Sequence, residues 1–194
     1  MSELSFGQIM RRNCEIDAQS GVMEFQGQWY DWAFLAETID GVAGILREFH
    51  VAAGADIAVV CRNRPHQVAA FCAVISSDRC VTPVNPFASA EKMVADLRDL
   101  EAAVVIASAA DWQSPVLQDY AKDNKLLGIS LDETRSTQHL VALPYRKPTD
   151  QVTSVRLNPG VAVLIQSSGT TGKPSGFQFT PPSSVLHMAI FLSE

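Results

Sequence analysis

Short apolar runs that do not alternate with polar residues recur along the first part of this chain. They span residues 56–61, 80–84, 103–107 and 126–131. Runs of this kind are typical of strands in parallel sheets, where both faces of each strand are covered. Segments with helical features separate them, at residues 65–76, 89–100 and 115–122. The alternation predicts an α/β fold with a parallel-rich sheet and helices on both of its faces.

The residues before the first run predict a hairpin and a long helix. Residues 22–25 and 28–30 flank Gly27 and are typical of two short strands joined by a turn. Asp31 can cap the helix that follows. The apolar residues of this helix recur at spacings of three and four, which defines one helical face: Trp32, Leu35, Ile39, Val42, Leu46 and Phe49.

The composition argues against several classes of protein. Hydrophobic residues make up 47% of the 194 residues and charged residues 19%, so the chain can bury a core and is not typical of disordered proteins. The net charge of −6, without a block of like charges, argues against nucleic acid as a partner. The N-terminus lacks the apolar core of a secretory signal, and the longest apolar run, residues 68–75, is too short to span a bilayer. We therefore expect a cytoplasmic protein that binds neither nucleic acid nor membranes, and we leave homo-oligomer formation open.

The cysteines and histidines form no recognisable metal or redox motif. The cysteines, Cys14, Cys61, Cys72 and Cys80, include no C-x-x-C pair, and three of the four lie in apolar surroundings. We interpret them as small side chains that are buried and stay reduced. The histidines are scattered along the sequence, so we expect no metal site built from protein side chains.

The sequence changes character after residue 131. We divide the chain into residues 1–131, with the alternating strands and helices, a polar surface connection at 132–158, and residues 159–194. The last part begins with the apolar run 161–165, in which we expect Val163 and Ile165 to be buried. A stretch rich in glycine, serine and threonine follows, and then a second strand near residues 177–179 and the start of a helix are expected.

The stretch SSGTTGKPSG, residues 167–176, is the strongest functional signal in the sequence. A flexible linker is disfavoured because two expected strands flank the stretch closely. Glycines let backbone N–H groups approach a polyphosphate, and hydroxyl and ammonium groups add further donors. The sequence thus predicts a strand–loop–strand unit that binds phosphate, with these candidate residues: Ser167, Ser168, Gly169, Thr170, Thr171, Gly172 and Lys173.

The loop does not fit the Walker A pattern G-x-x-x-x-G-K-[ST]. Two residues rather than four separate Gly169 from Gly172, and a proline follows Lys173 where the Walker pattern has a hydroxyl for magnesium. A strand is expected after the stretch, whereas a Walker loop leads into a helix. A P-loop NTPase is therefore disfavoured.

The stretch does resemble the phosphate-loop signature of the AMP-forming acid ligases, a superfamily that includes acyl- and aryl-CoA synthetases, luciferases and adenylation domains of peptide synthetases. That signature runs [ST]-S-G-[ST]-T-G-x-P-K-G between two strands, and Ser175 stands where the family has its second lysine. By this position Ser175 is a further candidate for cofactor binding. The resemblance extends over residues 20–194 and includes the P-x-N-P turn at 83–86. A second departure is Pro181, which follows Thr180 where many members have histidine.

The resemblance implies an enzyme in which a small-molecule carboxylic acid attacks the α-phosphate of Mg-ATP. Pyrophosphate leaves, and coenzyme A or a carrier thiol then takes the acyl group from the acyl-adenylate. It implies that ATP, Mg²⁺ and coenzyme A serve the full-length enzyme, and that the loop holds the β- and γ-phosphates.

The family's ribose-binding aspartate and C-terminal catalytic lysine have no counterpart in this sequence. We therefore expect an incomplete N-terminal domain without catalytic residues of its own, completed by the remainder of a longer chain. The alternative is a family member that has lost catalysis and serves as a binding or scaffold domain, which Ser175 and Pro181 motivate.

Overall fold

The computed structural model describes residues 5–132, 140–150, 157–167 and 175–179. The helices are α1 (Phe6–Ile16), α2 (Trp32–Glu48), α3 (Pro65–Ser76), α4 (Ala90–Asp99), the short 3₁₀ turn η1 (Asp111–Gln113) and α5 (Pro115–Asp123). The strands are β1 (Gly21–Phe25), β2 (Gln28–Asp31), β3 (Asp56–Val60), β4 (Cys80–Val84), β5 (Val104–Ser108), β6 (Leu127–Leu131), β7 (Leu140–Ala142), β8 (Val163–Ser167) and β9 (Ser175–Phe179).

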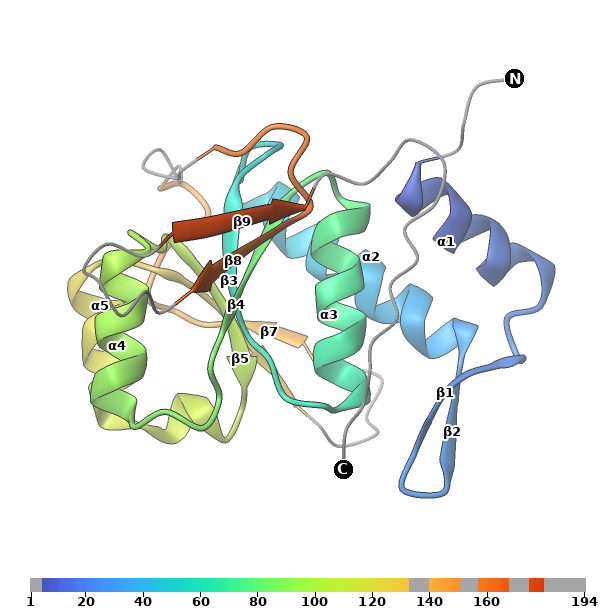
Figure 1. Ribbon diagram of the computed structural model, residues 1–194, viewed down its shortest axis with the longest axis horizontal. Helices are drawn as coiled ribbons and strands as arrows, with labels where there is room; N and C mark the ends of the chain where they lie inside the picture. The colour runs from blue at the N-terminus through green and yellow to red at the C-terminus, as the bar shows by residue number, and fades with distance from the viewer. Residues whose placement is uncertain (1–4, 133–139, 151–156, 168–174, 180–194) are drawn as a thin grey trace.

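Seven of the described strands form one sheet in the order β7-β6-β5-β3-β4-β8-β9, and β1 and β2 form a separate hairpin. Strands β6, β5, β3, β4 and β8 run parallel, while β7 and β9 pair antiparallel at the two edges. In Figure 1 the helices α2 and α3 lie on one side of the sheet, and α4 and α5 lie on the other. The α/β fold class and the strand–helix alternation are therefore confirmed.

The central strands are buried on both faces, as their lack of alternation predicts. In β3, Ile57 and Val59 pack into a core with residues of α1, α2 and α3. The side chains between them, Ala58 and Val60, pack into a second core with residues of α4 and α5. Successive side chains of a strand point to opposite faces, so each apolar residue of β3 meets a helical layer.

The helix starts lie where the sequence places them. Asp31 Oδ1 accepts a hydrogen bond from the amide of Phe34 at 2.8 Å, and Ser89 Oγ accepts one from the amide of Lys92 at 3.3 Å. Both are N-cap contacts that satisfy free amides of the first turn. The predicted hairpin is also confirmed, with Gly27 in its turn at a φ of 77°.

The sequence interpretation missed the helix α1, the strand β7 and the short turn η1. Helix α1 buries only Gly7 and Met10, which is too few apolar residues for a clear periodic signal. A Cβ on Gly7 would lie 2.7 Å from the carbonyl oxygen of Ser76, so α1 approaches the end of α3 closely. Strand β7, within the stretch described as a connection, pairs antiparallel with β6. Its three residues give no alternation that could identify a strand.

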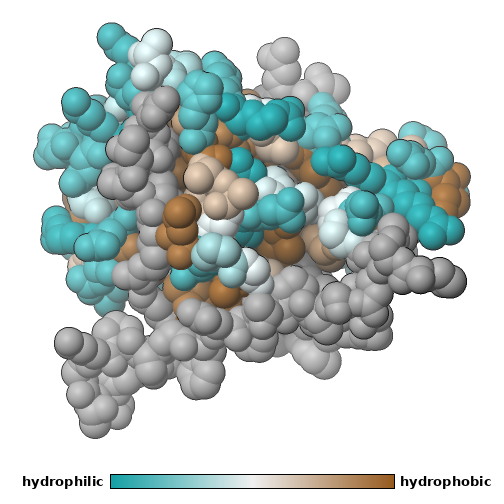
Figure 2. All heavy atoms as spheres, turned by 90° about the horizontal axis from the view of Figure 1, so that it is seen from above, coloured by the Kyte–Doolittle hydropathy of each residue, from teal (hydrophilic) through white to brown (hydrophobic). Residues whose placement is uncertain are grey.

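Strand β8 has the expected place but not the expected burial. Leu164 is 6% exposed, whereas Ile165 is 43% exposed and Val163 is only half-buried. The expectation that Val163 and Ile165 are both buried is therefore wrong. The side chains alternate along β8, and the deeply buried face carries Ala162 and Leu164 instead. Figure 2 shows hydrophobic atoms reaching the surface in the middle of the face seen from above, between polar borders.

Candidate phosphate-binding site

The strands on either side of the predicted loop form an antiparallel hairpin. The pairing runs from Val163 opposite Phe179 to Ser167 opposite Ser175. The backbones of two predicted site residues are thus adjacent at the loop end of the hairpin, as a strand–loop–strand unit requires. The other predicted site residues lie outside the described residues: Ser168, Gly169, Thr170, Thr171, Gly172 and Lys173.

The hairpin places the start of the loop at the carboxyl edge of the parallel strands. β8 runs parallel to β4, with Val163 opposite Val81, and the amide of Val81 donates to the carbonyl of Ala162 at 2.9 Å. The strands β3, β5 and β6 have the same direction. In open α/β sheets ligands bind outside the carboxyl ends of the strands, so the predicted loop leaves the sheet at the edge where ligands are expected.

A polar network joins three loops at this same edge. The Arg62 guanidinium, which follows β3, contacts both carboxylate oxygens of Asp111: Nη2 lies 2.8 Å from Oδ1 and Nη1 donates to Oδ2 at 3.1 Å. Nη2 also donates to the carbonyl of Pro86, after β4, at 3.1 Å. Asp111 accepts from the hydroxyl and amide of Ser108, at the end of β5. The network therefore connects the segments that follow β3, β4 and β5.

The sequence interpretation did not identify Arg62 and Asp111, although a signal existed. Arg62 directly follows the buried run 56–61, and Asp111 follows the run 103–107 by a few residues. Polar residues just after buried parallel strands gather at one edge of a sheet. The pairing of this arginine with this aspartate depends on the strand order, which brings β3 and β5 together although β4 lies between them in sequence.

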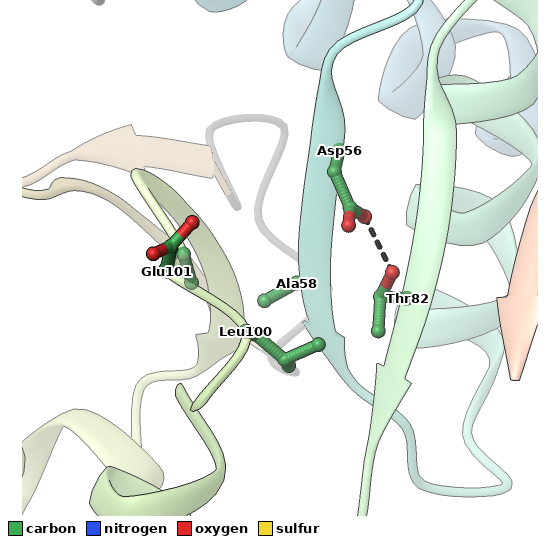
Figure 3. A pocket seen from close by; sticks show the side chains of 6 residues that line it. Asp56, Ala58, Thr82, Leu100 and Glu101 are labelled. Carbon is green, nitrogen blue, oxygen red and sulfur yellow. Dashed lines mark hydrogen bonds between the residues drawn. The ribbon is translucent and has the colours of Figure 1, made fainter. Parts of the chain in front are cut away.

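The opposite, amino edge of the sheet contains a small pocket. It is lined by residues of β3, β4 and the turn before β5, and Figure 3 shows Asp56, Thr82 and Glu101 around it. Thr82 Oγ1 donates to Asp56 Oδ1, and both residues are buried. This pocket has no room for a water molecule. It is therefore not a candidate ligand site.

Burial keeps three cysteine thiols protonated. It raises the pKa of Cys61 and of Cys72 to about 12, and the same cause, with the charge of Asp56 next, raises the pKa of Cys80 to about 12. A thiol must ionise to act as a nucleophile or metal ligand, so these three side chains are poorly suited to either role. All four cysteines are free of disulfides.

Among the described residues, no three His, Cys, Asp or Glu side chains gather in a way that could hold a metal ion. In the same part of the chain, every helix is too short or too polar to traverse a bilayer.

A family model described as AMP-binding enzyme matches residues 10–192. The chain therefore belongs to the AMP-binding enzyme family, as the loop signature indicates. No curated protein sequence matches the chain.

Several solved structures share the fold of this chain. They include the anthranilate CoA ligase AuaEII in complex with anthranoyl-AMP, with 16% identity and a TM-score of 0.64 over 93% of this chain and 34% of that one. O-succinylbenzoate CoA synthetase MenE from Bacillus subtilis, in complex with AMP, has 18% identity and a TM-score of 0.60 over 88% and 41%. A long-chain-fatty-acid-CoA ligase, FadD1 from Archaeoglobus fulgidus, has 16% identity and a TM-score of 0.63 over 92% and 37%.

Family and fold are thus those of adenylate-forming ligases. The chain spans 34–41% of the length of these three proteins.

Proposed function

We propose that this chain supplies the phosphate loop of an AMP-forming ligase that joins a small carboxylic acid to coenzyme A or a carrier thiol. One observation carries the proposal: in a member of the AMP-binding enzyme family, the SSGTTGKPSG stretch begins and ends on paired strands at the carboxyl edge of the sheet. The donor set of the stretch, backbone amides with hydroxyls and one ammonium group, suits phosphate oxygens.

In the proposed reaction the loop acts on the leaving group. The substrate carboxylate, which is ionised at neutral pH, attacks the α-phosphate of Mg-ATP without a general base. Negative charge then grows on the departing pyrophosphate. Donors on Thr170, Thr171 and Lys173 would hold the β- and γ-phosphates and stabilise that charge, so their effect is greatest in the transition state. Mg²⁺ would accompany the nucleotide, and coenzyme A would accept the acyl group.

The proposal assigns a role to each part of the chain. Residues 1–131 would form the α/β part of the adenylate-forming domain, 132–158 its connection, and 159–194 the phosphate-loop unit with the start of the next helix. The sequence contains no counterpart of the family's catalytic lysine, so we propose that residues 1–194 alone form no acyl-adenylate. Unpaired cysteines are typical of reducing compartments, which supports a cytoplasmic location.

A second candidate function is a binding or scaffold role without catalysis. Two residues favour it: Ser175 removes a positive charge from the signature, and Pro181 stands in place of a common histidine. A phosphate loop that binds pyrophosphate normally would count against this alternative.

Binding of Mg-pyrophosphate to isotopically labelled 1–194, followed by NMR, tests the proposal. We expect the amide signals of Gly169 and Gly172 to shift, and we expect Thr171→Ala and Lys173→Ala to weaken binding about tenfold, as loss of a charge-assisted hydrogen bond does. Lys92→Ala is the matched control because Lys92 lies on α4 with its side chain 64% exposed. Shifts elsewhere in the sheet but none in the loop would refute the phosphate assignment.

A further inference from the structure

We propose that Arg62 is a positioning residue for the phosphate loop. Together with Asp111, Arg62 fixes the turn after β4. Strand β4 pairs with β8, and β8 is the strand that leads into the loop. The inference rests on the proposed function of the loop, and it adds residues that lie outside the loop signature.

The contact between Arg62 and Asp111 is geometrically specific. Both terminal nitrogens of the guanidinium meet the carboxylate, at 2.8 and 3.1 Å, which is the bidentate arrangement that only arginine can make. The side chain of Asp111 is 8% exposed and that of Arg62 is 28% exposed, so solvent screens the pair only in part. A pair of this kind holds its two segments in one relative position.

Asp111 is also held by hydrogen bonds that do not involve Arg62. Its Oδ2 accepts from the Ser108 hydroxyl at 2.6 Å and from the Ser108 amide at 3.2 Å, and its own amide donates to Ser108 Oγ at 3.1 Å. Ser108 is the last residue of β5 and is buried. The carboxylate is therefore held by a central strand. Arg62, which binds this carboxylate, also donates a hydrogen bond to the carbonyl of Pro86 at 3.1 Å, so Pro86 is held in place as well.

Strand register connects Pro86 with the loop. Val60 lies opposite Val84, Val59 opposite Ile106, and Val81 opposite Val163. Continued in step, these registers place four residues in one row across adjacent strands: Ser108, Cys61, Asn85 and Ser167. Adjacent strands lie about 4.8 Å apart. Pro86, one residue beyond the row, is thus beside the point where the chain leaves β8 for the loop.

This arrangement spans the topological switch point of the sheet. The connection after β3 leads to β4, and the connection after β5 leads to β6 on the other side. Doubly wound sheets commonly bind ligands between two such strands. Here the Arg62–Asp111 pair connects the segments after β3 and β5 to each other. Arg62 also binds the carbonyl of Pro86, so the pair holds the segment after β4, the strand that pairs with β8.

A charge effect and a positioning effect predict opposite results for Asp111→Asn. If Arg62 only attracted polyphosphate, removing the neighbouring negative charge would leave binding unchanged or tighten it. If the pair positions the β4 turn, the same change weakens binding, because a loop held less firmly loses more freedom on binding. Arg62→Lys separates the effects again, since it keeps the charge and loses the bidentate contact.

The test measures Mg-pyrophosphate affinity by calorimetry and amide hydrogen exchange of Phe87 in 1–194. Phe87 follows Pro86, and its amide donates to Asn85 Oδ1 at 2.9 Å, so it reports on the turn. We expect both variants to bind about three- to tenfold more weakly, with faster exchange at Phe87. Asp119→Asn and Arg47→Lys are matched controls on exposed helical positions and should change neither quantity.

The outcomes separate the two proposals. Unchanged or tighter binding by Asp111→Asn, in a variant that is folded by circular dichroism, overturns the positioning role alone. Weaker binding without faster exchange at Phe87 also overturns it, because the turn would then not be the intermediary. If the unsubstituted chain binds no pyrophosphate, the proposed function fails and this inference fails with it.

Discussion

Strands β3 and β8 have similar apolar sequences and very different surroundings. The run that becomes β3 is Asp-Ile-Ala-Val-Val, and the run that leads into β8 is Val-Ala-Val-Leu-Ile. All five residues of β3 are buried. Around β8, Leu164 is 6% exposed but Ile165 is 43% exposed. Both are parallel strands of the same sheet, so the strand type does not explain the difference.

The neighbours of each strand explain it. β3 lies between β5 and β4 in the middle of the sheet, and its two faces belong to two hydrophobic cores, one with α1–α3 and one with α4–α5. β8 lies between β4 and the edge strand β9, and among the described residues only Val163 and Ala162 of this run join a core. An apolar run thus predicts a strand, but the helices packed on it decide how many of its faces are buried.

The largest expected effect compares a charge placed in each strand. Val59→Asp puts an unpaired carboxylate at a position with 0% exposure, and we expect it to lower the free energy of unfolding by about 4 kcal/mol or more. Val163→Asp, at a half-buried position, should lower it by only about 1–2 kcal/mol because water reaches the carboxylate. Urea denaturation of both variants measures the difference, and equal losses would show that β8 is enclosed as β3 is.

A smaller effect tests the two faces of β8. Leu164→Ala removes a buried side chain and should cost about 2–3 kcal/mol, whereas Ile165→Ala should cost less than about 1 kcal/mol. The two substitutions remove similar apolar volume from adjacent positions, so each is the control for the other. Thermal unfolding that ranks Ile165→Ala as the more damaging change would reverse the assignment of faces.

Local sequence signals predicted most of this fold. Caps at Asp31 and Ser89 and the periodic face of α2 depend on residues a few positions apart, so they can be found without knowing the tertiary structure. The burial of Ile165 and the existence of β7 depend on which elements pack beside them. Those contacts are formed by residues far away in the sequence, as β7 shows by pairing with β6 and packing Leu140 against Gly41 of α2.

The candidate site also has one part that the sequence predicts and another that depends on tertiary contacts. The strand–loop–strand unit was predictable because its signature is contiguous, and the pairing of Ser167 with Ser175 confirms the two strands. The roles of Ser168 to Lys173 remain predictions. Arg62 and Asp111 were not predictable as a pair, because only the crossing of the chain from β4 back past β3 to β5 brings them together.

The smallest expected effect uses two buried thiols to compare how firmly β8 and the helical layer are held. Cys72 of α3 is 5% exposed and packs in the core with α1–α3, while Cys80 of β4 is 0% exposed and its thiol interacts with the Leu164 backbone of β8. Burial is the main cause that raises the pKa of both thiols to about 12. Because the pKa of each thiol is raised in the folded state, burial of the protonated thiols contributes to stability. This contribution is complete below about pH 8.5, the pKa of an exposed thiol, and it is lost as the pH rises toward 12.

Alkylation by iodoacetamide below pH 8.5 therefore requires local opening that exposes the thiol. In a background with Cys14→Ser and Cys61→Ser, we expect Cys80 to react about tenfold faster than Cys72, which corresponds to an opening free energy lower by about 1.4 kcal/mol. The reason is that Cys72 packs in the main core, whereas Cys80 belongs to neither core of the described residues and its thiol interacts with β8, which few core residues hold. Faster modification of Cys72 would mean that the hairpin carrying the loop is held at least as firmly as the helical layer, and the contrast between β3 and β8 would then be one of exposure alone.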